Sequence, residues 1–182
     1  MRKPKKCINF NLAWKKDGEP ISKALVGDEV TLCADTHNIA DGTVATIKIV
    51  EKDADGNDDD VATLNAAVQN NKIECSWKVL YTADDDDADS KKEREEKGHT
   101  LPEYAFTIEC DGEKSAESGQ LDVMGWIKTK LINKRTKEIL KNRDFKLKDE
   151  SNNIIESGKT DSDGYVYVKN LKIGNYKIVL EV

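Results

Sequence analysis

Apolar and polar residues alternate with a period of two along nearly the whole chain. In one clear example Cys75, Trp77 and Tyr81 fall on one side of an extended segment, and the residues between them fall on the other. This alternation is typical of half-buried β-strands. It predicts strands at residues 8–14, 29–35, 43–51, 61–68, 72–81, 104–110, 119–124, 126–132, 144–149, 153–157, 165–169 and 175–182.

The separators between these segments are short polar turns built on glycine. Examples are Asp17-Gly18, Asp41-Gly42, Asp111-Gly112 and Asp163-Gly164. Short strands at this spacing, broken by such turns, favour β-sandwiches. We therefore predict an all-β fold of two tandem antiparallel β-sandwiches. The seven strands of the first half suggest an immunoglobulin-like sandwich, and the five of the second a smaller transthyretin-like (prealbumin-like) one.

The charge distribution divides the chain at the same place. Residues 1–125 have a net charge of −11 and residues 126–182 a net charge of +5. We therefore predict an acidic domain at 1–125 and a basic domain at 126–182. The two ends either meet different partners, attract each other, or are simply two solvated surfaces. The lysines and arginines of the basic half are spread evenly along alternating strands, without the basic–aromatic cluster that nucleic-acid binders show, so nucleic acid is not expected as a partner.

One segment breaks the alternation. Residues 84–98 are almost entirely charged, so they can bury nothing and are expected to form an exposed loop. Ser90 is a suitable cap for one or two helical turns, and Gly98 is a suitable stop. The loop is either a solvated excursion between strands or a partner-binding element.

Two acidic turns are candidates for cation binding. Asp53, Asp55, Asn57 and Asp59 offer oxygen ligands around a glycine, as calcium requires. The spacing does not fit an EF-hand, and the alternative is an acidic hairpin turn. The run Asp161-Ser162-Asp163 is read in the same two ways, as a ligand loop or as an Asx-stabilised turn before Gly164. No cofactor is expected, with calcium as the one candidate.

The cysteines are interpreted as free thiols. Cys75 and Cys110 share strand faces with apolar residues and should point inward, whereas Cys7 and Cys33 alternate out of phase with their apolar neighbours. No Cys-x-x-Cys pair occurs, and the two histidines lie in polar, loop-like sequence, so a zinc site is not expected. Trp126, at the proposed domain junction, is interpreted as structural, with ligand stacking as the alternative.

The motifs of common enzyme classes are missing from the sequence. It contains no Gly-x-Ser-x-Gly, no His-Glu-x-x-His and no glycine-rich phosphate loop. We therefore do not expect an enzyme. Neither a membrane span nor a cleaved signal peptide is visible. The expected location is therefore the cytoplasm, with export by a route that needs no cleaved signal as the alternative.

Several motifs resemble those of a known family. These motifs are Val26-Gly27-Asp28-Glu29-Val30-Thr31-Leu32, Trp77-Lys78-Val79-Leu80-Tyr81 and Lys97-Gly98-His99-Thr100-Leu101-Pro102-Glu103-Tyr104. They resemble the Ig-like module appended to VgrG-type spike proteins of type VI secretion and related contractile injection systems. Residues 160–182 resemble the carboxypeptidase-regulatory-like, or transthyretin-like, module that often follows. The gp27/gp5-like body and the β-helix of a spike protein are not present in this sequence.

This resemblance implies a non-enzymatic adaptor that binds or presents a secreted effector or another component of the injection apparatus. Lys128, Lys130 and Lys146 are the candidate partner-binding residues, because they lie on the basic half. The alternatives are a surface adhesin or cell-wall-binding module and a calcium-binding β-sandwich module.

Overall fold

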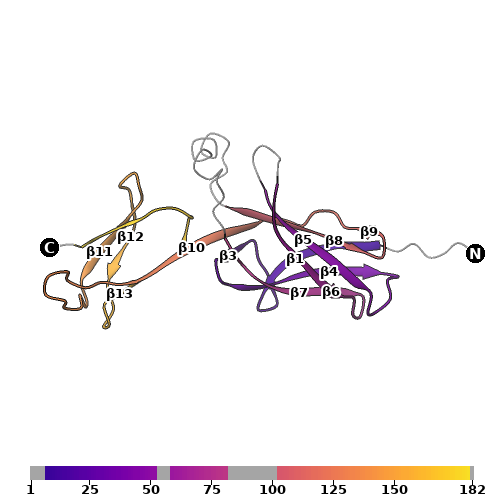
Figure 1. Ribbon diagram of the computed structural model, residues 1–182, viewed down its shortest axis with the longest axis horizontal. Coiled ribbons are helices and arrows are strands. Elements are labelled where there is room, and N and C mark those ends of the chain that lie inside the picture. The colour runs from indigo at the N-terminus through magenta and orange to yellow at the C-terminus, as the bar shows by residue number, and fades with distance from the viewer. Residues whose placement is uncertain (1–6, 53–57, 82–101, 181–182) are drawn as a thin grey trace, which may run out of the picture. The chain divides into compact units, whose positions relative to one another are not determined.

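The structure, a computed structural model, describes residues 7–52, 58–81 and 102–180, and every regular element in these ranges is a β-strand (Figure 1). The strands are β1 (Cys7–Lys16), β2 (Glu19–Pro20), β3 (Lys23–Leu25), β4 (Glu29–His37), β5 (Val44–Glu51), β6 (Asp59–Ala67), β7 (Lys72–Lys78), β8 (Glu103–Cys110), β9 (Glu113–Lys114), β10 (Leu121–Lys130), β11 (Asp144–Lys148), β12 (Ile154–Lys159), β13 (Tyr165–Leu171) and β14 (Lys177–Leu180). The predicted all-β fold of antiparallel sandwiches is confirmed.

The chain divides into two compact units, Met1–Val123 and Met124–Val182. Strand β10 crosses this division. Its first residues, Leu121 and Asp122, pair with β8, and its residues from Gly125 to Lys130 pair with β13.

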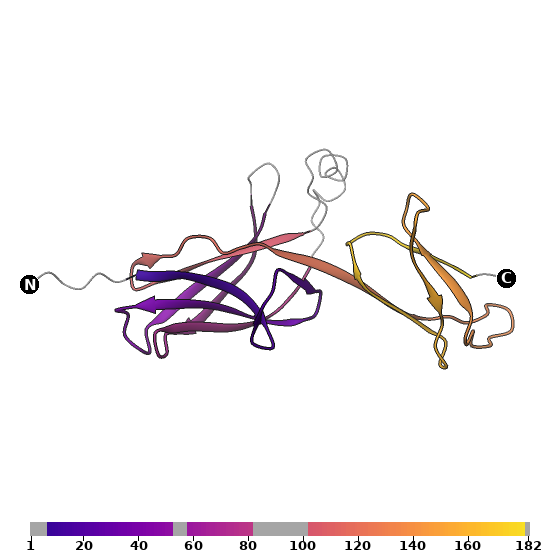
Figure 2. The same ribbon diagram turned by 180° about the vertical axis from the view of Figure 1, so that it is seen from behind.

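The first unit is built from two antiparallel sheets (Figures 1 and 2). One sheet has the order β2-β1-β4-β7, and the other contains β8, β5 and β6 in that order, with β9 paired to β8. The strand faces turned toward each other carry the apolar residues, which form one core cluster. The alternating burial of β5, in which Ala45, Ile47 and Ile49 are fully buried, shows why a period of two produces this packing.

Aromatic rings fill the centre of that core. Trp14 packs edge-on against Phe106 with 4.8 Å between ring centroids, and Trp77 lies 6.1 Å from Trp14. The Trp14 indole donates a hydrogen bond to the Gly119 carbonyl at 2.9 Å, and the Tyr104 hydroxyl donates one to the Leu80 carbonyl at 3.0 Å. The buried polar atoms of Trp14 and Tyr104 thereby have partners, as large amphipathic rings require.

The second unit is a thinner sandwich. The pair β10–β13 packs against the three-stranded antiparallel sheet β12-β11-β14. Five residues, Phe145, Leu147, Val166, Val168 and Leu171, form its buried core, and residues such as Ile127 and Ile178 are only partly covered. The small core leaves the outer faces of β10, β11 and β13 to solvent, and every residue of β12 is exposed.

The structure corrects several details of the predicted strands. The segments predicted at 119–124 and 126–132 belong to one strand, β10, since Gly125 continues the extended backbone across the gap. The strand predicted at 72–81 ends at Lys78 as β7, which carries the buried Trp77 and lies at the edge of its sheet. The two-residue strands β2 and β9 and the three-residue β3 were not predicted, because they are too short to show a periodic pattern.

Candidate functional site

The outer face of the β10–β13 pair is lined with basic and aromatic side chains. On β10, Lys128 and Lys130 are exposed, whereas Ile127 between Trp126 and Lys128 is half-buried. On β13, Val166 and Val168 are buried, which turns Tyr165 and Tyr167 to the same side as the lysines. Strand alternation therefore separates a core face from a basic, aromatic face.

The register of the two strands places cations opposite rings. Trp126 pairs with Lys169, Lys128 with Tyr167, and Lys130 with Tyr165. We call these six residues the basic–aromatic ladder. No basic–aromatic cluster was expected from the sequence, and this one was missed, because its two strands lie almost forty residues apart along the chain.

Each tyrosine ring in the ladder carries lysine ammonium groups over its face. The Lys128 Nζ lies 5.6 Å from the centroids of both Tyr165 and Tyr167. The Lys130 Nζ lies 5.3 Å from Tyr165, and the Lys169 Nζ lies 4.9 Å from Tyr167. At these distances an ammonium is attracted to the ring quadrupole, by about 0.5–1 kcal/mol at an exposed site. The contacts hold long, flexible lysine chains over one narrow strip.

Trp126 lies at one end of the ladder. Its side chain is 47% exposed and contacts Tyr167 edge-on, with 6.3 Å between ring centroids and 87° between ring planes. Tyr167 is itself 51% exposed. Two large exposed rings in contact on a small domain are uncommon away from interaction sites.

The turn before β13 sets the position of its tyrosines. Asp161 Oδ1 accepts hydrogen bonds from the backbone amides of Asp163 and Tyr165, both at 2.8 Å, and Gly164 has a φ of +81°. These bonds, with the Tyr165 amide first, lower the pKa of Asp161, and the nearby charge of Lys128 lowers it further. The interpretation of this run as an Asx-stabilised turn is confirmed.

A buried hydroxyl anchors the same turn. The Thr160 side chain is 1% exposed. Its Oγ1 donates a hydrogen bond to the Leu140 carbonyl and accepts one from the Arg143 amide at 3.0 Å. The start of β13 is thus tied to the loop that follows β10, which keeps the ladder strands in register.

The third predicted lysine lies elsewhere. Lys146 is on β11, opposite Ser157 of β12 and Val179 of β14. Its neighbours Phe145 and Leu147 point into the core, so Lys146 lies on the outer face of the three-stranded sheet. The structure therefore brings Lys128 and Lys130 together and leaves Lys146 on a different face.

The calcium candidates fall mainly outside the described residues. Asp53, Asp55 and Asn57 lie there, and Asp59 begins β6 opposite Glu51. β5 and β6 form the antiparallel hairpin predicted around this segment. Within the described ranges, no three His, Cys, Asp or Glu side chains are grouped as metal ligands.

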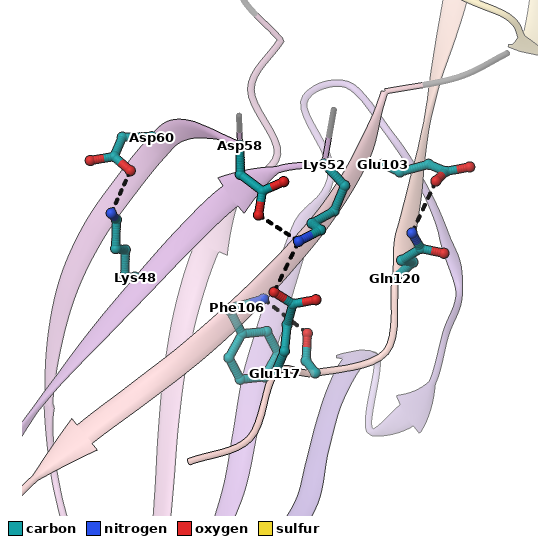
Figure 3. Close-up of polar contacts among 9 residues, drawn as sticks. Lys48, Lys52, Asp58, Asp60, Glu103, Phe106, Glu117 and Gln120 are labelled. Atoms are coloured by element: carbon teal, nitrogen blue, oxygen red, sulfur yellow. Dashed lines mark hydrogen bonds and ion pairs between the residues drawn. The ribbon is translucent and has the colours of Figure 1, made fainter. Parts of the chain in front are cut away.

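A lysine occupies the acidic base of this hairpin (Figure 3). The Lys52 Nζ contacts Asp58 and lies 3.1 Å from Glu117 Oε2, and its side chain is 24% exposed. The hydrogen bond to Asp58 is the main cause of the raised pKa of Lys52, with a smaller contribution from Glu117. A protonated ammonium between two carboxylates already neutralises charge that a cation would need.

The cysteines with described side chains are present as thiols outside any disulfide: Cys33, Cys75 and Cys110. Cys110 is buried and Cys75 packs partly against the core, as expected. Cys33 alternates with Leu32 and Ala34, as expected, but it is buried, because β4 lies between β1 and β7. Burial raises the pKa of both Cys33 and Cys75.

The charged segment at 84–98 and its predicted helical turns lie outside the described residues. In the part of the chain that the structure describes, there is no helix of the length and hydropathy needed to cross a membrane.

Comparison with protein families agrees with the second unit. Residues 125–182 match the family described as "SpaA: Prealbumin-like fold domain". This match covers the β10–β13 ladder and the three-stranded sheet, and it supports the transthyretin-like assignment. No curated protein matches the sequence.

Solved structures show only distant similarity. An immunoglobulin-like protein from Pseudomonas aeruginosa is 10% identical, with 66% of this chain and 97% of that chain covered at a TM-score of 0.37. The alkylpurine DNA glycosylase AlkC of Pseudomonas fluorescens is 10% identical over 65% of this chain, which spans only 30% of that chain, at a TM-score of 0.38. The T6 backbone pilin of Streptococcus pyogenes is 11% identical, covering 96% of this chain and 48% of its own, at a TM-score of 0.32. Similarities at this level carry no functional argument.

Proposed function

We propose that this protein is a non-enzymatic adaptor module that binds a protein partner through the basic–aromatic ladder of its second unit. The partner is a secreted effector or another component of a contractile injection apparatus of the type VI secretion kind. The protein works in the cytoplasm and leaves the cell with that apparatus.

The observation that carries this proposal is the ladder itself. It combines three exposed lysines with three aromatic rings, and aromatic residues are enriched where protein interfaces have their strongest contacts. The core side of these strands carries the buried Val166, Val168 and Leu171 and the partly buried Ile127, whereas the outer face adds only exposed cation–π contacts of about 0.5–1 kcal/mol each. Its composition is therefore better explained by binding than by stability.

Pairwise binding assays with effectors encoded near this gene test the proposal. We expect a saturable complex with one of them. Lys128→Glu with Lys130→Glu should weaken it at least about tenfold, because two attractive charges become repulsive. The matched control is Lys134→Glu with Lys141→Glu, which changes the net charge of the same unit equally on exposed loop residues. Failure of every neighbouring effector to bind would rule out the adaptor role.

A second candidate is a surface adhesin or cell-wall-binding module. The family match to a prealbumin-like domain favours it, since this fold type also occurs in such proteins. Thiol titration of protein taken from its native compartment distinguishes the two. Four reactive thiols after unfolding fit an intracellular adaptor, whereas oxidised cysteines fit an extracellular adhesin.

A further inference from the structure

We infer that the basic–aromatic ladder recognises an extended acidic segment of the partner, with carboxylates at every second residue. This inference rests on the proposed protein-binding function and specifies the chemistry of the segment that is bound.

The spacing of the lysines is the first support. Lys128 and Lys130 are two residues apart on one face of β10, which separates their Cα atoms by about 7 Å. An extended peptide repeats its side chains on one face with the same spacing. Alternate Asp or Glu residues therefore match successive lysines without a bend in either chain.

The arrangement of the aromatic rings is the second support, because it distinguishes carboxylates from nucleic acid as the bound anion. Stacking of bases or sugars needs open ring faces. Here lysine ammonium groups lie 4.9–5.6 Å from the ring centroids of Tyr165 and Tyr167, so a base that stacked on these faces would have to displace them. The Trp126 ring stands at 87° to Tyr167, so the two exposed rings do not form one continuous flat platform. The ladder offers ammonium groups and tyrosine hydroxyls, which bind carboxylates.

Charge and local chemistry are the third support. The ladder lies in the half of the chain with a net charge of +5, so an acidic segment is attracted from a distance. The charge of Lys128 contributes to the lowered pKa of Asp161 in the turn before β13, so a carboxylate beside the ladder is stabilised by it. Trp126 at the end of the strip provides an apolar contact for a residue flanking the acidic run.

Fluorescence anisotropy of a labelled peptide with the full-length protein tests the inference. The probe is Thr-Glu-Thr-Glu-Thr-Glu, and the control peptide has the same composition with its three glutamates consecutive. We expect saturable binding of the alternating peptide, at least about fivefold tighter than the consecutive one, and weakening by at least about tenfold in Lys128→Glu with Lys130→Glu. The control variant Lys134→Glu with Lys141→Glu should stay within about twofold of the parent protein.

Two further measurements keep the outcome decisive. Raising the salt concentration should weaken peptide binding to the unaltered protein, because the contacts are exposed ion pairs. This salt test does not need the double variant, so it remains valid even if that variant does not fold. Overturning results are equal binding of both peptides, no saturation up to millimolar peptide, or tighter binding of a thymidine hexanucleotide than of the alternating peptide. If the peptides fail while an effector still binds, only the acidic-segment inference is lost. If no effector binds, the adaptor function itself is lost.

Discussion

Gly164 is the residue whose substitution should most disturb the second unit. Its φ of +81° is costly for any residue with a Cβ, by about 1–2 kcal/mol. A Cβ at this position would also overlap the Cγ2 methyl of Ile139 and lie 3.4 Å from the Leu131 carbonyl oxygen. Overpacking of this kind costs about 1–3 kcal/mol. Gly164→Ala should therefore destabilise the unit by about 3 kcal/mol.

This cost is large for a domain of this size. A unit of about sixty residues has a free energy of unfolding of about 3–9 kcal/mol, and 1 kcal/mol moves its midpoint by about 4–8 °C. Differential scanning calorimetry of the full-length protein should show one transition lowered by at least about 10 °C. Hydrogen exchange of the β13 amides assigns that transition to the second unit.

Two variants separate the causes. Ile139→Ala in the Gly164→Ala background removes the overlapping methyl and should recover about half of the loss, leaving the backbone cost. Gly174→Ala is the matched control, because a Cβ there meets no atom within 4 Å, and it should change the midpoint by no more than a few degrees. A Gly164→Ala protein that melts like the parent would refute this explanation of the turn.

Three further outcomes follow from the ion pairs and turns. Backbone amides hold the pKa of Asp161 below its unfolded value. The ionised carboxylate therefore contributes fully to stability above about pH 4, and this contribution is lost as the pH falls through the lower folded pKa. Acid unfolding monitored by circular dichroism should accordingly show a weaker pH dependence in Asp161→Asn. Lys52→Gln should lower the stability of the first unit by about 1 kcal/mol in urea unfolding, whereas Lys48→Gln, which removes the more exposed Lys48–Asp60 pair, should have no measurable effect. Titration calorimetry should show no heat with millimolar calcium, because Lys52 neutralises the acidic base of the hairpin. A calcium-dependent rise in melting temperature that is lost in Asp59→Asn would contradict this expectation of no calcium binding.

Much of the fold could be predicted, because alternation and turn chemistry are local signals. Every predicted strand corresponds to a strand of the structure, although two predicted segments merge into β10. Burial of Cys33 could not be predicted from its phase along β4. β4 lies between β1 and β7, and which strands lie side by side is decided by pairing between distant segments.

The candidate site was predictable only in part. Lys128 and Lys130 were identified from charge alone, but their aromatic partners were missed, because Tyr165 and Tyr167 meet them only across the β10–β13 register. A signal was available. On each strand, basic or aromatic residues occur at every second position, away from the core face. The pattern is Trp126-x-Lys128-x-Lys130 on β10 and Tyr165-x-Tyr167-x-Lys169 on β13, where Val166 and Val168 are the buried residues between them. Lys146 was named on the same ground, because net charge does not distinguish the outer faces of two sheets.

The most direct test of partner binding by the ladder is a titration of the full-length protein with each neighbouring effector, in parallel with its two charge-reversal variants. We expect one effector to form a saturable complex with the parent protein and with Lys134→Glu/Lys141→Glu, and to lose at least about tenfold in affinity with Lys128→Glu/Lys130→Glu. Equal affinity for all three proteins, or no complex with any effector, would contradict a binding role for this face.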